Sequence, residues 1–241
     1  MTALVARELA IVGRLRTTDL DLQAGELVAL VGPNGGGKTS LLRALARIES
    51  AAGAVTIDGE DIAEAPMARR RQLLSFLPAS RDVSWPISAR DVIRLGLGRD
   101  DEPRVDELIS LFEMDKLAGR PVNQLSTGER TRVLTARAIA SRPKILLLDE
   151  PLSNLDPYWV IRFMEIFATA AQSGQTVLAA LHDLAQLDRF DRALLISDGQ
   201  IQMDKAPADL MASERFEEIF RISSASGQWA IRKPAGPRSL P

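Results

Sequence analysis

The sequence of 241 residues contains no cysteine and only one histidine, His182. Without thiols it can form neither a disulfide nor a thiolate metal site, and a single imidazole excludes a histidine-rich zinc site. Its 30 basic residues are outnumbered by 32 acidic ones, so no basic excess indicates a nucleic-acid partner. No apolar run approaches the ~18 residues that a membrane-spanning helix needs.

The first ten residues contain Arg7 and Glu8 and lack the apolar core of a signal peptide. We therefore expect a protein of the cytoplasm, whose membrane role, if any, comes through a partner. With 46% hydrophobic residues, the chain is long enough to bury a full α/β core and to carry a smaller subdomain.

The segment 32–39 fits the phosphate-binding pattern G-x-x-x-x-G-K-[ST]. The apolar run before it predicts a buried strand, and leucines with Ile48 recur after it at helical spacing. In this context backbone N–H groups and a helix N-terminus attract phosphate. Lys38 is placed to reach the β- and γ-phosphates, and Thr39 to hold Mg²⁺. The predicted nucleotide-binding residues here are Gly32, Pro33, Asn34, Gly35, Gly36, Gly37, Lys38, Thr39 and Ser40.

Two carboxylates, Asp149 and Glu150, directly follow the apolar run 145–148. A continuous apolar run is typical of a buried parallel strand, and the carboxyl ends of such strands are where open α/β sheets bind ligands. Asp149 is suited to the Mg²⁺ shell. Glu150, one residue further, is suited to face an attacking water.

Three later motifs complete a resemblance to the ATP-binding subunit of an ABC (ATP-binding cassette) transporter. Leu125–Glu129 resembles the LSGGQ-type signature, with threonine for the middle glycine and glutamate as the last residue. Ser126 lies 23 residues before Asp149, a spacing that the family uses, although a serine there is also a good helix N-cap. Ser153–Asp156 resembles the D-loop, and His182 resembles the switch histidine. The resemblance covers about residues 4 to 222.

This resemblance implies a fold and a mechanism. The fold is an α/β P-loop NTPase core with a small antiparallel β region and a helical subdomain. Two copies would bind head to tail, with ATP between the phosphate loop of one and Ser126, Thr127, Gly128 and Glu129 of the other. The catalytic residues would be Glu150, which polarises water in line with the γ-phosphate, and His182, which contacts that phosphate.

We expect one nucleotide-binding domain over residues 1–222, with the helical subdomain at about 77–140. Helical spacing predicts helices over 89–97, 102–114 and 208–222, and residues 192–204 predict a hairpin. Residues 223–241 are expected to form a C-terminal tail, with fraying over Lys233–Pro241.

The sequence departs from the family pattern at two places. Where relatives usually carry a glutamine that touches Mg²⁺, this chain has Ala79, and the neighbouring Ser80 is a candidate substitute. The family also stacks adenine on an aromatic residue near the N-terminus, but no aromatic residue precedes Phe76. The remaining candidates for the base contact are Ile11, Val12, Arg14 and Arg16.

Within the family, residues 32–35, 77–86 and 90–93 resemble importers of iron–siderophore, haem or cobalamin complexes. The implied partners are integral-membrane permease subunits, a second copy of this chain and, indirectly, a substrate-binding protein. The implied location is the cytoplasmic face of the inner membrane. Two alternatives stay open: a nucleotide-binding ABC module with weak hydrolysis, and a non-transport ABC ATPase.

Overall fold

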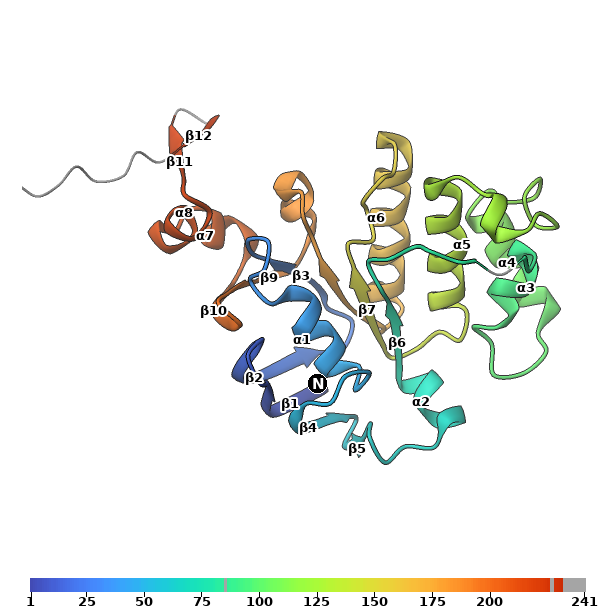
Figure 1. Cartoon of the computed structure of the whole chain (residues 1–241), viewed down its shortest axis with the longest axis horizontal. Coiled ribbons are helices and arrows are strands. Elements are labelled where there is room, and N and C mark those ends of the chain that lie inside the picture. The colour runs from blue at the N-terminus through green and yellow to red at the C-terminus, as the bar shows by residue number, and fades with distance from the viewer. Residues whose placement is uncertain (85, 226–227, 232–241) are drawn as a thin grey trace, which may run out of the picture.

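The computed structural model describes residues 1–84, 86–225 and 228–231. A six-stranded sheet forms the middle of the molecule, with an antiparallel sheet on one side and helices on the other (Figure 1). The predicted fold class, an α/β P-loop core with a small antiparallel region and helices, is confirmed.

The central sheet is parallel except for one edge strand, β10, which pairs antiparallel with β9. In spatial order its strands are β10 (Gln200–Lys205), β9 (Arg192–Ser197), β3 (Leu27–Val31), β8 (Thr176–Ala180), β7 (Ile145–Asp149) and β6 (Leu74–Leu77). The predicted strands before Gly32 and Asp149 are β3 and β7, and every residue of both is buried. They read as continuous apolar runs because both faces of the sheet are covered.

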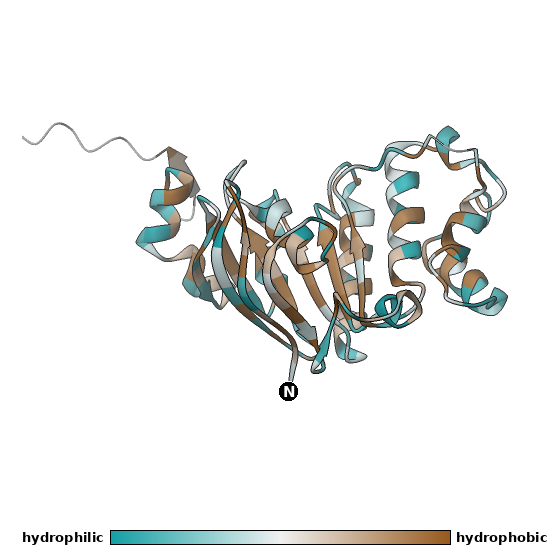
Figure 2. Ribbon diagram, turned by 60° about the horizontal axis from the view of Figure 1, so that its bottom comes forward, coloured by the Kyte–Doolittle hydropathy of each residue, from teal (hydrophilic) through white to brown (hydrophobic). Residues whose placement is uncertain are grey.

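Successive side chains of β3 enter two different cores. Leu27 and Val31 belong to a core shared with the helices, whereas Val28 and Leu30 belong to a core shared with the antiparallel sheet. That sheet consists of β2 (Leu15–Gln23), β1 (Thr2–Ile11), β4 (Ala52–Ile57) and β5 (Glu60–Asp61). Figure 2 shows the resulting concentration of apolar residues along the strands.

Helix α1 (Lys38–Leu45) follows the phosphate loop and belongs to the core of the antiparallel sheet. The prediction that Ile48 continues its apolar face is wrong. The helix ends at Leu45, Arg47 adopts a left-handed φ of 51°, and Ile48 is 61% exposed. A residue in that conformation ends the helical repeat, so the later side chain no longer shares the face.

Helices α3 (Ala89–Arg94), α4 (Glu102–Leu111) and α5 (Thr127–Ile139) lie together at one end of the molecule (Figure 1). Both α3 and α4 are three residues shorter than the spacing predicted. Further helices are α2 (Met67–Leu73), which directly precedes β6, the short 3₁₀ helix η1 (Val122–Gln124) and the long helix α6 (Pro157–Gln172). Within the described ranges, no helix combines the length and apolarity needed to cross a bilayer.

The predicted hairpin at 192–204 is confirmed as β9 and β10, which the 3₁₀ helix η2 (Leu184–Arg189) precedes. The predicted single helix over 208–222 is instead two, α7 (Pro207–Met211) and α8 (Glu214–Phe220). Ser213 separates them because its hydroxyl accepts a hydrogen bond from Phe216 N at 3.2 Å and caps α8. A small hairpin follows, β11 (Ile222–Ala225) with β12 (Gln228–Ile231). The predicted fraying of Lys233–Pro241 concerns residues outside the described ranges. Trp85 also lies outside them.

Candidate functional site

The phosphate loop is pressed against the turn between β9 and β10. A Cβ on Gly32 would lie 2.0 Å from the carbonyl oxygen of Ile196, so only glycine fits there. Gly37 has φ 110° and turns the chain into α1, the conformation that glycine adopts at least cost. Gly199 N donates to Gly36 O at 3.0 Å and fastens the loop to the hairpin. The loop is therefore fixed in shape by the β9–β10 hairpin.

Lys38 folds back over this loop. Its Nζ donates to the carbonyl oxygens of Gly32, at 2.7 Å, and Pro33, at 3.2 Å. The residue is only 8% exposed, and this burial lowers the pKa of its ammonium, while the charges of Glu150 and Asp149 raise it. An incoming phosphate would offer this ammonium an anionic partner that the loop carbonyls cannot supply.

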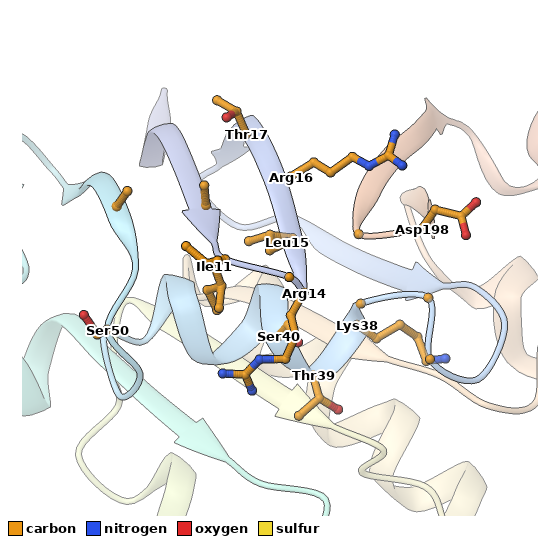
Figure 3. A pocket seen from close by; sticks show the side chains of 18 of the residues that line it. Ile11, Arg14, Leu15, Arg16, Thr17, Lys38, Thr39, Ser40, Ser50 and Asp198 are labelled. Atoms are coloured by element: carbon orange, nitrogen blue, oxygen red, sulfur yellow. The ribbon is translucent and has the colours of Figure 1, made fainter.

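A cavity of about 1010 Å³ opens over the loop and the start of α1 (Figure 3). Its other wall is the β1–β2 connection, which places all four predicted base-contact candidates in the lining: Ile11, Val12, Arg14 and Arg16. Arg14 extends across α1, where its guanidinium is paired with the carboxylate of Glu49, whereas Arg16 extends toward the side of Asp198. Among the candidates for the base contact, Arg14 is therefore the one whose planar guanidinium is held in place by an ion pair.

Asp149 ends β7 with only 1% of its surface exposed. Burial raises the pKa of its carboxyl, and the neighbouring Thr39 hydroxyl lowers it. Both carboxylate oxygens are buried without a hydrogen-bond partner in the described part of the chain. A hydroxyl beside an unpaired carboxylate is a donor set that suits Mg²⁺, which takes one or two protein oxygens and fills its shell with phosphates and water. Thr39 and Asp149 therefore fit the ion.

Glu150 turns away from the strand with φ 50°, a left-handed conformation that is uncommon outside glycine. Its Oε2 accepts a hydrogen bond from the Ser153 hydroxyl at 3.3 Å. The residue lines the loop cavity and also a second cavity of about 330 Å³, which Asn154 and His182 help to form. The structure thus brings Glu150 and His182 to one space at the edge of the phosphate site.

The signature segment begins helix α5. Ser126 Oγ accepts from Glu129 N at 3.2 Å, and Ser126 N donates to Glu129 Oε2 at 2.8 Å. This reciprocal pair is a capping box, so the helix-cap interpretation of Ser126 holds as well. None of residues 126–129 is among the described residues that line the two cavities. Within one chain, the signature and the phosphate loop are apart.

Sequence reasoning missed Arg81. Its Nη2 donates to the carbonyl oxygens of Asp149 and Glu150, both at 3.1 Å, from a side chain that is almost fully buried. Ser80, the proposed substitute for a glutamine, instead directs its hydroxyl to the Asp82 carboxylate at 3.1 Å. Its place in the chain could have indicated this contact, because Arg81 follows β6, the strand that pairs with β7.

These features define a P-loop nucleoside triphosphatase. The sequence profile of the ABC transporter family matches residues 15–153. The chain belongs to the ABC transporter family, and it is an ATPase of that family.

Three curated relatives are similar over most of this chain. The hemin import ATP-binding protein HmuV of Streptomyces coelicolor is 38% identical over 84% of this chain and 76% of its own. The petrobactin import ATP-binding protein FpuC of Bacillus anthracis is 32% identical over 87% and 82%. The cobalamin import ATP-binding protein BtuD of Halobacterium salinarum is 35% identical over 86% of this chain and 54% of its own length. The predicted resemblance to this group is confirmed.

A solved structure of a dimeric ATP-binding cassette in a post-hydrolysis state with ADP and phosphate has the same fold. Its TM-score is 0.75 at 23% identity, over 85% of this chain and 98% of that one.

Proposed function

We propose that this chain is the ATP-hydrolysing subunit that powers a membrane permease for import of an iron–siderophore, haem or cobalamin-type complex. The observation that carries the proposal is its similarity, over most of its length, to ATP-binding proteins of hemin, petrobactin and cobalamin import. A phosphate loop and a glutamate, Glu150, that line one cavity support the same conclusion. The chain would act at the cytoplasmic face of the inner membrane, bound to permease subunits and linked through them to a substrate-binding protein.

Within that function, the residues of the loop cavity bind and orient ATP. Residues 32–40 surround the phosphates, while Thr39 and Asp149 hold Mg²⁺, which neutralises phosphate charge when bound. Glu150 orients and polarises the attacking water, and His182 contacts the γ-phosphate from the second cavity, which Glu150 also lines. Phosphoryl transfer needs mainly such positioning and charge neutralisation.

The remaining contacts would come from a second copy. Because residues 126–129 lie away from the phosphate loop in one chain, they are free to contact ATP bound to another. A head-to-tail homodimer brings the two halves together and forms two such sites.

Uptake assays in the source organism test the function. A strain lacking the gene would be supplied separately with hemin, ferric petrobactin and cobalamin, each radiolabelled, and complemented with wild type or Lys38→Ala. We expect the wild type to restore uptake of one compound and Lys38→Ala to restore none, because that variant lacks the phosphate-facing charge. Normal uptake of all three compounds without the gene would contradict the proposal.

A further inference from the structure

Arg81 is the one buried arginine among those that the structure describes, with 8% of its surface exposed. It follows β6, whose Leu77 pairs with Leu148 of β7. The segment after β6 therefore crosses the carboxyl end of β7, where Asp149 and Glu150 lie. Burying a guanidinium costs free energy unless hydrogen bonds and opposite charges compensate it, so its partners indicate its role.

Arg81 uses one nitrogen to bridge two successive carbonyl groups. Its Nη2 donates at 3.1 Å to the main-chain oxygens of both Asp149 and Glu150. These oxygens flank the turn at which Glu150 adopts φ 50°. Such a conformation persists only where the surroundings hold it, and it sets the direction in which the Glu150 side chain leaves the backbone.

The other terminal nitrogen, Nη1, is buried and lacks a hydrogen-bond partner among the described residues. Burial lowers the pKa of the guanidinium, while the charges of Asp149 and Glu150 favour its ionised form. Neighbouring side chains supply no equivalent group, because Ala79 has only a methyl and Ser80 donates to Asp82. Arg81 is thus the fixed polar group that this segment directs at the acidic pair.

We propose that Arg81 is a positioning residue for ATP hydrolysis, which clamps the Asp149–Glu150 turn and thereby fixes the direction of the Glu150 carboxylate. The inference rests on the proposed role of Glu150 in orienting water. Loss of the clamp leaves the phosphate loop intact, so it impairs the chemical step rather than nucleotide binding. Geometry matters here, since a shift of about 1 Å in a catalytic group can cost on the order of 10²-fold in rate.

The test compares Arg81→Met and Arg81→Lys with wild type by steady-state hydrolysis of ATP with Mg²⁺. We expect Arg81→Met to lower kcat by on the order of 10²-fold with little change in KM. Arg81→Lys should recover part of the rate, because an ammonium also donates to carbonyl oxygens. Equilibrium ATP binding should be retained in both variants.

Arg104 provides a matched control. It also bridges two carbonyls, through Nε to Ala140 at 3.3 Å and Nη2 to Ile139 at 3.2 Å, and its side chain is 11% exposed. These carbonyls lie at the C-terminal end of α5, away from the loop cavity. Arg104→Met should lower the melting temperature as Arg81→Met does, while its kcat stays at the wild-type value.

A second measurement uses the nucleotide-free protein. Glu150 N donates to Ala180 O at 3.1 Å and Ser153 N to Glu150 O at 3.3 Å, so amide exchange at these residues reports on the turn. Exchange at both should quicken in Arg81→Met and not in Arg104→Met. The double variant Arg81→Met/Glu150→Gln should be no slower than Glu150→Gln, because Arg81 acts through Glu150.

Either of two outcomes would overturn the role of Arg81 without overturning the role of Glu150. The first is a turnover of Arg81→Met that falls no further than that of Arg104→Met. The second is an unchanged rate of amide exchange at Glu150 and Ser153 in Arg81→Met. Either leaves the role of Glu150 intact if Glu150→Gln is inactive. Wild-type turnover by Glu150→Gln would instead overturn the catalytic role of Glu150, on which the inference rests.

Discussion

The backbone nitrogen of Glu150 donates to the carbonyl oxygen of Ala180 at 3.1 Å. This bond joins the acidic end of β7 to the end of β8, two residues before His182. It explains how residues that are distant in sequence come to line one cavity. The carboxyl ends of adjacent parallel strands meet at the same edge of a sheet, so their following residues form one site.

Glu150→Gln should lower ATP turnover by at least about 10²-fold, because it removes the carboxylate that polarises water. ATP binding should survive, since the phosphate loop is unchanged, and an ATP-bound dimer should accumulate. Phosphate release and size-exclusion chromatography measure these effects. Unchanged turnover would show that another group orients the water.

Ser126→Arg should abolish dimerisation and hydrolysis but leave ATP binding to the single chain, because a bulky charge would occupy the place of the partner's γ-phosphate. The substitution also removes a helix cap, worth about 1 kcal/mol. Ser213→Arg is the control, since Ser213 caps α8 outside the cavities. Normal hydrolysis by Ser126→Arg would contradict the head-to-tail arrangement.

Ala79→Gln should reduce the Mg²⁺ concentration needed for half-maximal ATPase activity. One added contact to the metal shell is worth roughly 1 kcal/mol, or about fivefold in concentration. Ala79 is exposed, so the longer side chain can be accommodated. Ser80→Ala serves as the control and should leave the Mg²⁺ titration unchanged. Superimposable curves for wild type and Ala79→Gln would remove position 79 from metal binding.

Asp149→Asn should stabilise the nucleotide-free protein at neutral pH. Burial raises the pKa of Asp149 in the native state, and the Thr39 hydroxyl and the nearby cations Arg43 and Arg81 offset this only in part. The native state therefore holds the proton more tightly than the unfolded chain, so stability falls as pH rises from about 4 through the native pKa. At pH 7 the ionised Asp149 carboxylate therefore lowers the stability of the native state.

Thermal unfolding between pH 4 and 8, without Mg²⁺, measures this effect. If the carboxylate costs about 1 kcal/mol, Asp149→Asn should melt about 2–4 °C higher at pH 7 and show a flatter pH profile. Asp188→Asn, which removes an exposed carboxylate in η2, is the control for the change in net charge. A lower melting temperature for Asp149→Asn at pH 7 would contradict the prediction.

Arg14→Ala should weaken ATP binding more than Arg16→Ala, because Glu49 holds the Arg14 guanidinium in the cavity wall where it can stack on a base. A fluorescent ATP analogue titrated into each variant gives the affinities. Inorganic triphosphate, which has no base, should bind both variants alike. Equal affinities for ATP would assign the base contact to Ile11 or Val12.

The sequence by itself determined the central architecture and the phosphate chemistry. Continuous apolar runs predicted β3 and β7. The glycine-rich motif between β3 and α1 predicted the phosphate loop, because its backbone conformation requires glycine. These signals are local, because strand periodicity and loop conformation depend on residues that are adjacent in the chain.

Tertiary structure decided which distant groups meet. It paired β6 with β7 and so buried Arg81 against the carbonyls of Asp149 and Glu150, which no spacing in the sequence indicates. It directed Ser80 to Asp82 and divided the last predicted helix at Ser213. Burial and hydrogen-bond partners arise from strand order across the sheet, and strand order is a property of the whole fold rather than of any one segment.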